Sequence, residues 1–571
     1  GPDDFNLCLK NGMKAVETVN NDGRYTKNIP IFEGTHVFKA DEIIIKNLQE
    51  QKNLLGSGSL VHSYPHSWRS KAPLVHRATP QWFISMESHK LRNKALKSID
   101  QTAFFPEKGK ARIRAMIETR PDWCISRQRS WGVPLPIFVN KKTNEPLRDK
   151  EVVENIAKIY EKEGSDCWFD DDPQRFLGKK YKKEDFIKSN DIVEVWFDSG
   201  STHSFVLEKR KDLKWPASMY LEGSDQHRGW FHSSLLESCG TRGRAPFDSI
   251  LSHGFVVDGK GMKMSKSAGN IISPEDILKK YGADILRLWV ASSDYAEDLR
   301  IDHSILDQHA ESYRKIRNTF RFILGNLRDD YSPKNFKQIK NSEHPELEQL
   351  ILHKIFLLNQ QIKKNLKEYN FHKLQKELLN FCALDLSSFY FDIRKDILYC
   401  DDINSKKRKN CIDILNIILE CLIKWYAPVL SFTTEEISQL SQKNKTKSIH
   451  EDNFPEIPQS WKNEALFKKW EKLLNVRQKV NIAIEEKRSK KVIGSSLEAE
   501  VEISLPKIEF ELLKEIDAKE LFITSNVIQK ISKENNIGIK VEKAKGTKCI
   551  RCWKIVEAVK DEKCPRCLKI K

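Results

Sequence analysis

Residues 219–231 read MYLEGSDQHRGWF, and this segment sets the expectation of an α/β fold. It begins with three apolar residues, typical of a short buried strand, and passes at once into carboxylates, an amide and glycines. Such polar groups at the carboxyl end of a strand are where an α/β sheet binds the ribose of a nucleotide. Further apolar runs at 192–197 and 250–251 alternate with helical segments, as in an α/β domain.

A second segment, KMSKS at residues 263–267, places two lysines around small polar residues, between glycines on both sides. This pattern predicts a mobile loop that brings Lys263 and Lys266 onto a triphosphate. In-line displacement at phosphorus needs positive charge on the leaving oxygens more than it needs a protein nucleophile. The alternative is a solvated basic turn. Downstream, SPED at 273–276 predicts the capped start of a helix.

Four of the twelve cysteines gather in the last 23 residues, as two Cys-x-x-Cys pairs separated by eleven residues: Cys549, Cys552, Cys564 and Cys567. Four thiolates can hold one tetrahedral Zn²⁺ and leave no position open for catalysis, so we expect one structural zinc. Residues 541–571 carry ten Lys and Arg against four Asp and Glu, and they include Trp553. This composition favours contact with RNA. A tail that contacts only protein is the alternative, and the other eight cysteines are predicted to be reduced, mostly buried thiols.

The composition is that of an ordinary globular protein, with 571 residues, 39% hydrophobic and 31% charged, which excludes a disordered or fibrous chain. The net charge of +17 favours a polyanionic partner, nucleic acid first, although a Lys-rich surface bias is the alternative. No signal-peptide pattern is present. The apolar stretch 411–430 is broken by Asp413, Asn416, Glu420 and Lys424 at helical spacing, which predicts an amphipathic bundle helix and no membrane span.

Four motifs follow one another along the chain: WCISRQR at 123–129, WFDSG at 196–200, GSDQHRGWF at 223–231 and KMSKS at 263–267. In this order they resemble the class I aminoacyl-tRNA synthetases, and within them the bacterial isoleucyl-tRNA synthetases. The resemblance covers essentially the whole chain. It implies ATP-dependent attachment of isoleucine to its tRNA through an isoleucyl-adenylate, with ATP and Mg as substrate and hydrolytic editing of misacylated valine. It also implies a monomeric cytoplasmic enzyme.

The resemblance also implies the site residues. Lys266, helped by Lys263, would bind the ATP phosphates and stabilise departing pyrophosphate, and Asp4 would bind the α-amino group of a misacylated residue in the editing domain. The substrate-binding set consists of Glu222, Gly223, Asp225, Gln226, Trp196, Trp230 and His253. Its first four members would hold the adenylate, the two tryptophans would wall the isoleucine pocket, and the histidine would lie near the nucleotide.

The expected architecture is multidomain, α/β plus all-α. Residues 1–62, with β-like runs at 29–32 and 35–38, would be the C-terminal part of the editing domain. Residues 63–302 would be the second half of a Rossmann-like catalytic domain, and the helix-periodic residues 303–490 a helical anticodon-binding bundle. Residues 491–547, where Ala499, Val501 and Ile503 alternate with polar residues, would be a small α+β junction domain, and residues 548–571 a zinc-binding tail.

Two departures from the family pattern matter. No His-Ile-Gly-His type segment for ATP occurs, so we expect the C-terminal portion of a longer enzyme, inactive as an isolated fragment. Residues 67–70 read SWRS where some relatives carry cysteines, so no metal is expected there. Two alternatives stay open: a valyl- or leucyl-type synthetase, and a stand-alone tRNA-binding protein that uses the bundle and the tail.

Overall fold

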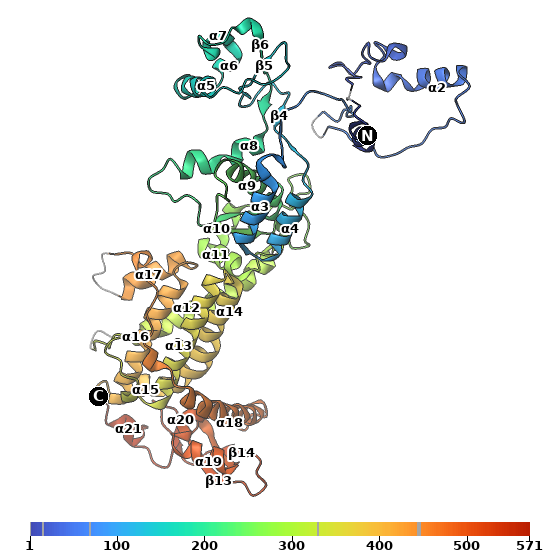
Figure 1. The fold of residues 1–571 in the computed structure, drawn as a ribbon. Coiled ribbons are helices and arrows are strands. Elements are labelled where there is room, and N and C mark those ends of the chain that lie inside the picture. The colour runs from blue at the N-terminus through green and yellow to red at the C-terminus, as the bar shows by residue number, and fades with distance from the viewer. Residues whose placement is uncertain (1, 14–15, 68–69, 328–330, 442–446, 571) are drawn as a thin grey trace. The chain divides into compact units, whose positions relative to one another are not determined.

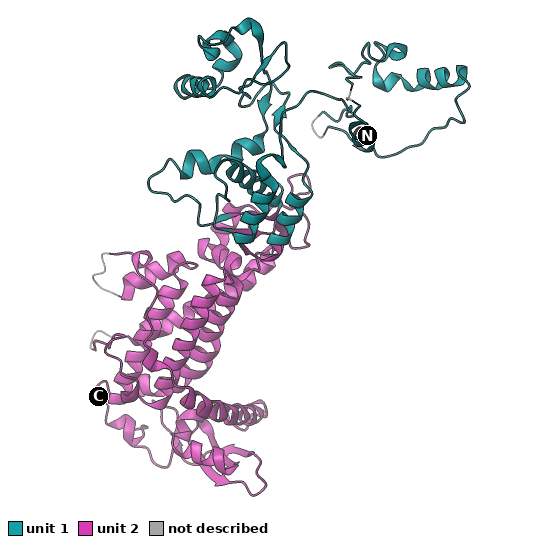
Figure 2. Cartoon of the chain, viewed as in Figure 1, with its two compact units in different colours: residues 1–103, 110–220, 225–249 teal, residues 104–109, 221–224, 250–571 magenta. Residues whose placement is uncertain are grey.

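The computed structural model describes residues 2–13, 16–67, 70–327, 331–441 and 447–570. The chain forms two compact units, and each is described by itself (Figure 2). The first comprises residues 1–103, 110–220 and 225–249, and the second comprises residues 104–109, 221–224 and 250–571.

The N-terminal part of the first unit differs from the β-rich module that was expected. It contains the helices α1 (Pro2–Lys10) and α2 (Asp41–Glu50), and the two β-like runs hold the 3₁₀ turns η1 (Pro30–Phe32) and η2 (Val37–Lys39). Among the described residues of 1–62, β pairing is limited to isolated bridges. The second run makes one isolated bridge, between His36 and Arg24, and neither run pairs with a neighbour over enough of the described residues to form a strand ladder. The expectation of strands there is therefore wrong.

Helix α9 (Trp230–Thr241) is the buried centre of the first unit (Figure 1). Eight of its twelve residues are buried, and four of these eight are His or Ser. It packs against α3 (Leu91–Gln101) and α8 (Val195–Gly200). At the contact with α3, the Cys239 sulfur lies 3.4 Å from the Ser98 hydroxyl. Other elements of this unit are α4 (Lys108–Glu118), β1 (Phe83–Ile84), β3 (Trp123–Cys124), β4 (Ser126–Arg127) and β7 (Ile192–Val193).

Residues 138–188 form a small α/β module with its own core in the first unit. Trp168 is fully buried there, its ring lies 5.0 Å from those of both Phe138 and Phe176, and its Nε1–H donates to the Ser189 carbonyl at 2.8 Å. The elements around it are β5 (Phe138–Asn140), antiparallel to β6 (Phe186–Lys188), with α5 (Lys150–Glu163), α6 (Cys167–Asp170) and α7 (Pro173–Leu177).

Short strands precede the helices of the second unit. One sheet has the order β2 (Ala103–Phe105), β9 (Ser249–His253), β8 (Tyr220–Gly223). A parallel pair joins β10 (Val256–Asp258) to β11 (Leu299–Ile301). Next come α10 (Pro274–Tyr281) and α11 (Ala283–Ser292). The predicted helix start is confirmed, because the Ser273 hydroxyl accepts a hydrogen bond from the Asp276 N–H at 3.2 Å.

The bundle of the second unit is built around α16 (Lys406–Tyr426), which is buried along most of its length (Figure 1). The predicted polar stripe is confirmed as the less buried side of this helix, because Asn416, Glu420 and Lys424 are half-buried and only Asp413 is fully buried. Asp413 is 1% exposed and accepts hydrogen bonds from the Tyr331 hydroxyl at 2.8 Å and the Lys334 N–H at 2.9 Å. The surrounding helices are α12 (His303–Asn326), α13 (Glu346–Lys367), α14 (Phe371–Asn380), the π-helix η8 (Phe381–Phe391), α15 (Asp392–Cys400), α17 (Ser431–Ser441) and α18 (Glu464–Ser489).

A buried carboxylate joins α11 to the bundle. Asp284, 8% exposed, accepts hydrogen bonds from the Phe432 N–H at 3.2 Å, the Thr433 N–H at 2.8 Å and the Thr433 hydroxyl at 2.6 Å, all at the start of α17. One turn along α11, Arg287 donates to the carbonyls of Pro428 and Val429 at 2.7 and 3.0 Å. The first contact satisfies N–H groups that a helix start leaves without intrahelical partners, which makes the joint specific.

The second unit ends in an α+β segment and the cysteine-rich tail. Along β12 (Ala499–Leu505) buried and half-buried residues alternate, as the sequence predicts. It pairs in parallel with β13 (Asn526–Ile531) and antiparallel with β14 (Gly538–Lys543). Its helices are α19 (Lys507–Lys514) and α20 (Ala518–Phe522), and the tail holds β15 (Thr547–Lys548), β16 (Ile555–Val556) and α21 (Pro565–Leu568).

A buried ion network ties this segment to the bundle. Arg394 on α15 donates to both carboxylate oxygens of Glu348 on α13, each at 2.6 Å, and also contacts Glu520 on α20. The side chains of Arg394 and Glu348 are 4% and 1% exposed. Glu520 is also bound by Lys407 at 2.6 Å.

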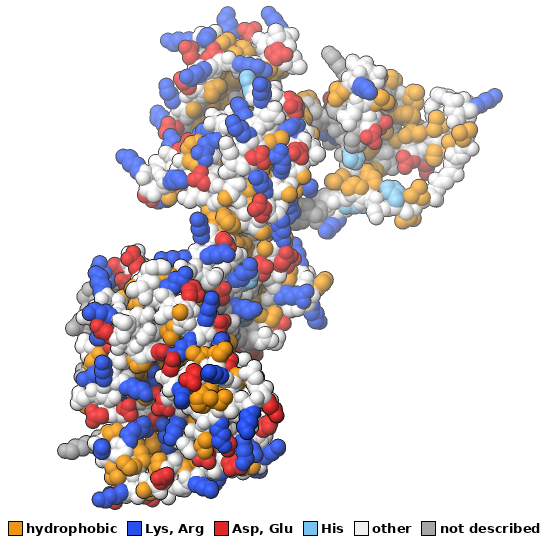
Figure 3. All heavy atoms as spheres, turned by 60° about the horizontal axis from the view of Figure 1, so that its bottom comes forward, with side chains coloured by type: hydrophobic (Ala, Val, Ile, Leu, Met, Phe, Trp, Pro, Cys, Tyr) orange, Lys and Arg blue, Asp and Glu red, His pale blue; other side chains and the backbone are white. Residues whose placement is uncertain are grey.

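The surface carries both signs of charge. Lys and Arg side chains are spread over the face in Figure 3, with Asp and Glu side chains between them. A search of the described helices for one of bilayer-spanning length and apolarity finds none.

We expect Arg394→Ala to lower the free energy of unfolding by about 3–5 kcal/mol, because it leaves the buried carboxylate of Glu348 uncompensated. Urea unfolding followed by tryptophan fluorescence measures the change. The matched control is Lys395→Ala on the same helix, whose ion pair with Asp392 is half exposed. A loss for Arg394→Ala no larger than that of the control would contradict the buried network.

Candidate functional site

The loop that carries the predicted catalytic lysines is held at its base and exposed at its tip. Asn270 accepts a hydrogen bond from the Ser265 N–H at 2.9 Å and donates to the Asp258 carboxylate at 2.9 Å. Met264 is half-buried and packs against the cluster that contains Ile277 and Trp289.

Lys263 and Lys266 are both exposed, and neither pairs with an acidic side chain in the part of the chain that the structure describes. Two unpaired ammonium groups on an anchored loop are free to bind an anion brought from solution.

Three predicted residues lie at the ends of two neighbouring strands. Glu222 and Gly223 end β8, where the Glu222 carboxylate accepts from the Gly223 N–H at 3.1 Å, and His253 ends the adjacent strand β9. His253 Nδ1 lies 2.8 Å from the Gly254 carbonyl oxygen. Because a carbonyl only accepts, Nδ1 carries the proton, and in the neutral ring Nε2 is an acceptor.

Gly254 is required by packing. A Cβ there would lie 2.3 Å from the Glu297 carbonyl oxygen, so the backbone of these two segments can approach only without a side chain. This close approach fixes the path of the backbone next to His253.

The other predicted substrate residues come together in the first unit. Gln226 lies in the 3₁₀ turn η6 (Ser224–His227), and its side-chain oxygen accepts from the Trp230 N–H at 2.9 Å. The Trp196 ring lies against Gly229, where an added Cβ would be 2.8 Å from it. Trp196 is 40% exposed, and the Trp230 indole N–H donates to the Ser199 carbonyl at 3.0 Å. Asp225 is exposed beside Gln226.

The apolar run at 192–197 is a strand only at β7, and its second half is helical. The Glu194 carboxylate accepts from the N–H groups of Trp196 at 3.1 Å and Phe197 at 3.2 Å, and thereby starts α8. This N-cap turns the chain and positions Trp196. Sequence reasoning missed Glu194, although a carboxylate directly before a run that can form a helix is a recognisable cap signal.

Two further residues of this region were missed. Tyr220 stacks on Trp230 with ring centroids 4.1 Å apart, and it stands inside the segment quoted first. Glu237 lies two helical turns after Trp230, and its Oε1 has no hydrogen-bond partner among the described residues. Burial, with the nearby carboxylates of Asp198 and Glu194, raises the pKa of Glu237 to about 9, so this group is protonated at neutral pH. The position of Glu237 in the sequence gives no indication that its side chain is buried.

Asp4, the predicted editing residue, is exposed on α1. It lies in the first unit, and its proposed role stays a prediction. Trp68 and Arg69 of the SWRS segment lie outside the described residues.

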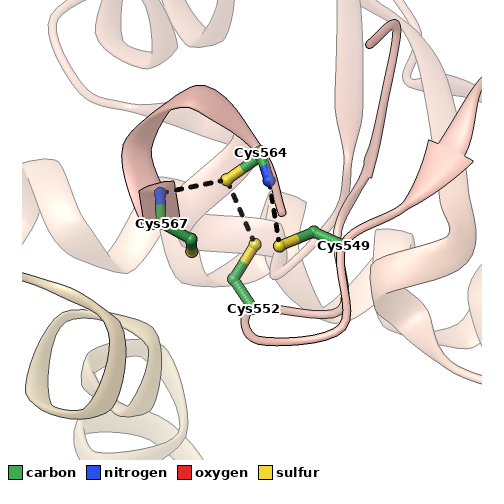
Figure 4. Close-up of side chains that lie close together, drawn as sticks. All are labelled: Cys549, Cys552, Cys564 and Cys567. Atoms are coloured by element: carbon green, nitrogen blue, oxygen red, sulfur yellow. Dashed lines mark hydrogen bonds between the residues drawn. The ribbon is translucent and has the colours of Figure 1, made fainter. Parts of the chain in front are cut away.

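The four tail cysteines form one cluster (Figure 4). All four are buried, and their sulfur atoms lie within 4.8 Å of one another. The Cys564 N–H donates to the Cys549 sulfur at 3.3 Å, and the Cys567 N–H donates to the Cys564 sulfur at 3.5 Å. Burial alone would raise the pKa of the Cys549 thiol, but backbone N–H groups of Cys552, Cys564 and Arg551 lower it to about 6.

The cluster fits a tetrahedral thiolate site. Thiolates at the usual distance of about 2.3 Å from a tetrahedral zinc lie about 3.8 Å apart, and the sulfurs of Cys552 and Cys564 are 3.8 Å apart. Backbone N–H donors favour the thiolate of Cys549, the form that binds metal, whereas burial raises the pKa of Cys552 to about 11 and also raises that of Cys567. The remaining cysteines are free thiols, of which Cys8, Cys124 and Cys167 are half-buried and the other five are buried, as predicted.

Ion pairs hold the cysteine cluster against α15. Arg566 makes two hydrogen bonds to the Asp396 carboxylate, at 2.7 and 2.6 Å, and Lys554 pairs with Asp396 at 3.1 Å. Cys400 packs against the four cysteines, and its thiol lies 3.7 Å from the Arg551 carbonyl. Trp553, the exposed aromatic of the tail, is 60% exposed.

Two family profiles match the chain. Residues 7–302 match the family described as tRNA synthetases class I (I, L, M and V), and residues 348–503 match the anticodon-binding domain of tRNA ligase.

Individual relatives agree with these profiles. The isoleucine–tRNA ligase of Pelagibacter ubique is 68% identical over 555 residues, which are 97% of this chain and 61% of that protein. That of Mesorhizobium japonicum is 46% identical over 535 residues, covering 90% of this chain and 53% of that protein. The chain is also similar to a crystal structure of Mycobacterium tuberculosis methionyl-tRNA synthetase bound by methionyl-adenylate, with a TM-score of 0.48 and 14% identity, covering 67% of this chain and 66% of that one. The chain thus spans between 53% and 61% of the length of the two ligases. Since the first profile alone covers more than half of its residues, the chain belongs to the class I tRNA synthetases of the isoleucine, leucine, methionine and valine group.

Proposed function

We propose that the chain takes part in the ATP-dependent attachment of isoleucine to its tRNA, through an isoleucyl-adenylate. The observation that carries the proposal is the anchored loop at 263–267, with two exposed lysines that no described acidic side chain neutralises. The choice of isoleucine over valine or leucine rests on the similarity to ligases named for isoleucine.

In this proposal the protein supplies charge and position. The isoleucine carboxylate attacks the α-phosphorus of ATP, the bond to the bridging oxygen breaks, and pyrophosphate leaves with the electron pair. Lys266, with Lys263, neutralises the charge that develops on the departing oxygens. Glu222, Gly223, Asp225 and Gln226 hold the adenylate, and His253 contacts the nucleotide. Trp196 and Trp230 wall the side-chain pocket, where the Tyr220 stack and the Glu194 cap keep the two indoles in place.

The domain assignment is part of the same proposal. Residues 1–62 belong to an editing domain in which Asp4 binds the amino group of misacylated valine. Residues 63–302 complete a catalytic domain, 303–490 bind the anticodon arm, 491–547 form a junction, and 548–571 hold one structural zinc. One methylene is worth only about 1–3 kcal/mol of discrimination, which is the known difficulty of telling isoleucine from valine in this family and the reason for a hydrolytic second site.

We expect Lys266→Ala to lower isoleucine-dependent ATP–pyrophosphate exchange by about 10²–10³-fold, the usual effect of removing one group that stabilises transition-state charge. Exchange is measured with this chain alone and with a purified N-terminal half of a relative added. Lys279→Ala, an exposed lysine on α10, is the matched control and should leave the rate unchanged.

The same assay separates the alternatives. Exchange that requires the added half and responds to isoleucine supports the proposal, whereas a response to valine or leucine reassigns the substrate. Unchanged kinetics in Lys266→Ala would remove that lysine from the mechanism. No exchange in a mixture shown to associate would favour a protein that only binds tRNA.

We expect about one zinc per chain by elemental analysis of freshly purified protein, and loss of that zinc in Cys564→Ser, since three thiolates no longer close the tetrahedron. Cys8→Ser, which replaces a half-buried thiol of the first unit, is the control and should keep the metal. Metal-free wild-type protein, or full zinc content in Cys564→Ser, would contradict a four-cysteine site.

A further inference from the structure

The loop that carries the two exposed lysines follows a tight hairpin, which the Asp258 carboxylate closes. Oδ1 of Asp258 accepts hydrogen bonds from the Lys260 N–H at 3.0 Å and the Met262 N–H at 2.8 Å. On the returning side of the hairpin, Lys263 forms an antiparallel bridge with Val257. The hairpin therefore fixes the backbone of Lys263 beside β10.

The hairpin itself is held by its neighbours on both sides. Strand β10 pairs in parallel with β11, with Asp258 opposite Ile301. A Cβ added at Gly259 would overlap the Asp302 carboxylate. That carboxylate accepts a hydrogen bond from the Ile305 N–H at 2.8 Å and so caps the start of α12. The backbone that follows Asp258 thus packs against the cap of the first bundle helix, which makes Asp258 a fixed point.

Asn270 joins the far end of the loop to this fixed point, and its amide fits in one orientation only. The side-chain oxygen accepts from the Ser265 N–H at 2.9 Å, and the side-chain nitrogen donates to Asp258 Oδ2 at 2.9 Å and to the Lys263 carbonyl at 3.3 Å. A backbone N–H only donates, and carboxylate and carbonyl oxygens only accept, so the opposite orientation would break all three contacts. The bond from Asn270 is also the main reason why the pKa of Asp258 is lowered.

Residues 265–269 form the tip of the loop, and Lys266 is part of it. Apart from the bond to Asn270, the hydrogen bonds of these described residues stay within the tip. The Ala268 N–H donates to the Ser265 hydroxyl at 3.2 Å, and the N–H of the next residue donates to the Lys266 carbonyl at 3.3 Å. On its C-terminal side, the tip is therefore tied to the fixed hairpin through Asn270.

We propose that Asp258 and Asn270 are positioning residues for Lys266, and that the hydrogen bond between their side chains fixes the place from which this lysine meets the departing pyrophosphate. This role rests on the proposed function, in which Lys266 stabilises charge that develops during the reaction. An interaction made only in the transition state acts on kcat and leaves KM nearly unchanged. Loss of the bond between Asp258 and Asn270 therefore lowers kcat and spares the KM for ATP.

The chemistry of the pair allows its two members to be exchanged. Asp258→Asn alone sets one amide N–H₂ group against another, and Asn270→Asp alone sets two carboxylates against each other. With both substitutions, the new amide at position 258 keeps its oxygen for the two hairpin N–H groups and donates to the new carboxylate at position 270. That carboxylate still accepts from the Ser265 N–H, and only the 3.3 Å contact with the Lys263 carbonyl is lost.

Trypsin measures the anchoring of the loop without any need for activity. Cleavage of the full chain after Lys266 is followed by mass spectrometry, and this bond is four residues from the nearer substitution. We expect each single variant to be cut about 5- to 10-fold faster than the wild-type chain, and the double variant to stay within about twofold of it, because a released tip opens more often.

The controls make the same changes on the surface of the bundle. Asp402 accepts a hydrogen bond from the Asn404 N–H at 2.8 Å, and Asn335 accepts one from the Lys337 N–H at 3.1 Å. Asp402→Asn and Asn335→Asp should both be cut after Lys266 at the wild-type rate.

ATP–pyrophosphate exchange, with a purified N-terminal half of a relative added, separates kcat from KM. A displacement of about 1 Å can cost about 10²-fold in rate, so we expect each single variant to have a kcat about 10- to 100-fold lower. The KM for ATP should stay within about threefold of the wild-type value, and the double variant should recover kcat to within about threefold.

Each result decides between the possibilities. Recovery of loop protection and of kcat in the double variant supports the positioning pair. A double variant that combines both losses, or single variants that behave like the controls, would overturn it. Faster cleavage of the single variants at an unchanged kcat would leave the pair with a purely structural role. Absence of exchange in the wild-type mixture would overturn the proposed function, whereas the trypsin comparison would still show by itself whether the pair anchors the loop.

Discussion

Helix α11 packs into two hydrophobic cores, and the carboxylate of Asp284 holds the helix in the position that allows both contacts. Trp289 packs in the cluster beneath the lysine loop, whereas its neighbour Leu288 packs in the core of the bundle. Asp284 caps the start of α17 from the same helix, so α11 can neither rotate nor slide without uncovering backbone N–H groups. The loop that carries Lys263 and Lys266 therefore starts from a base that the helical bundle holds.

The bundle is stabilised by polar side chains that are buried among its apolar residues. Asp413 is buried on α16 because Tyr331 and Lys334 cover it, and Arg394 is buried because Glu348 and Glu520 surround it. Removing either kind of partner would leave a charge or an acceptor without compensation. Such contacts select one packing of the helices among the many that apolar side chains alone would allow.

Features that depend on neighbours in sequence could be predicted, and those that depend on distant partners could not. The Ser273 cap, the alternation along β12 and the approach of the four tail cysteines follow from spacing within a few residues or from a short loop. The sequence predicted a loop at residues 263–267, and the structure has one there. The hydrogen bonds of Asn270 that anchor this loop, one of them to Asp258, became visible only in the structure. The 3₁₀ turns at 30–39, the helix that begins after Glu194, the π-helix η8 and the raised pKa of Glu237 arise from tertiary surroundings. The motifs proposed Trp196 and Trp230 as substrate residues, and the stacking of Tyr220 on Trp230 became visible only in the structure.

Arg566 stands between Cys564 and Cys567, so the backbone that sets these two sulfurs also sets the guanidinium that holds Asp396. Any ion that closes the cysteine cluster and the contact with α15 are therefore thermodynamically linked. The free energy of docking adds to the affinity for the ion, and the ion in turn raises the effective concentration of Arg566 at α15. If an ion is bound there as proposed, its removal would therefore weaken the contact between the tail and α15.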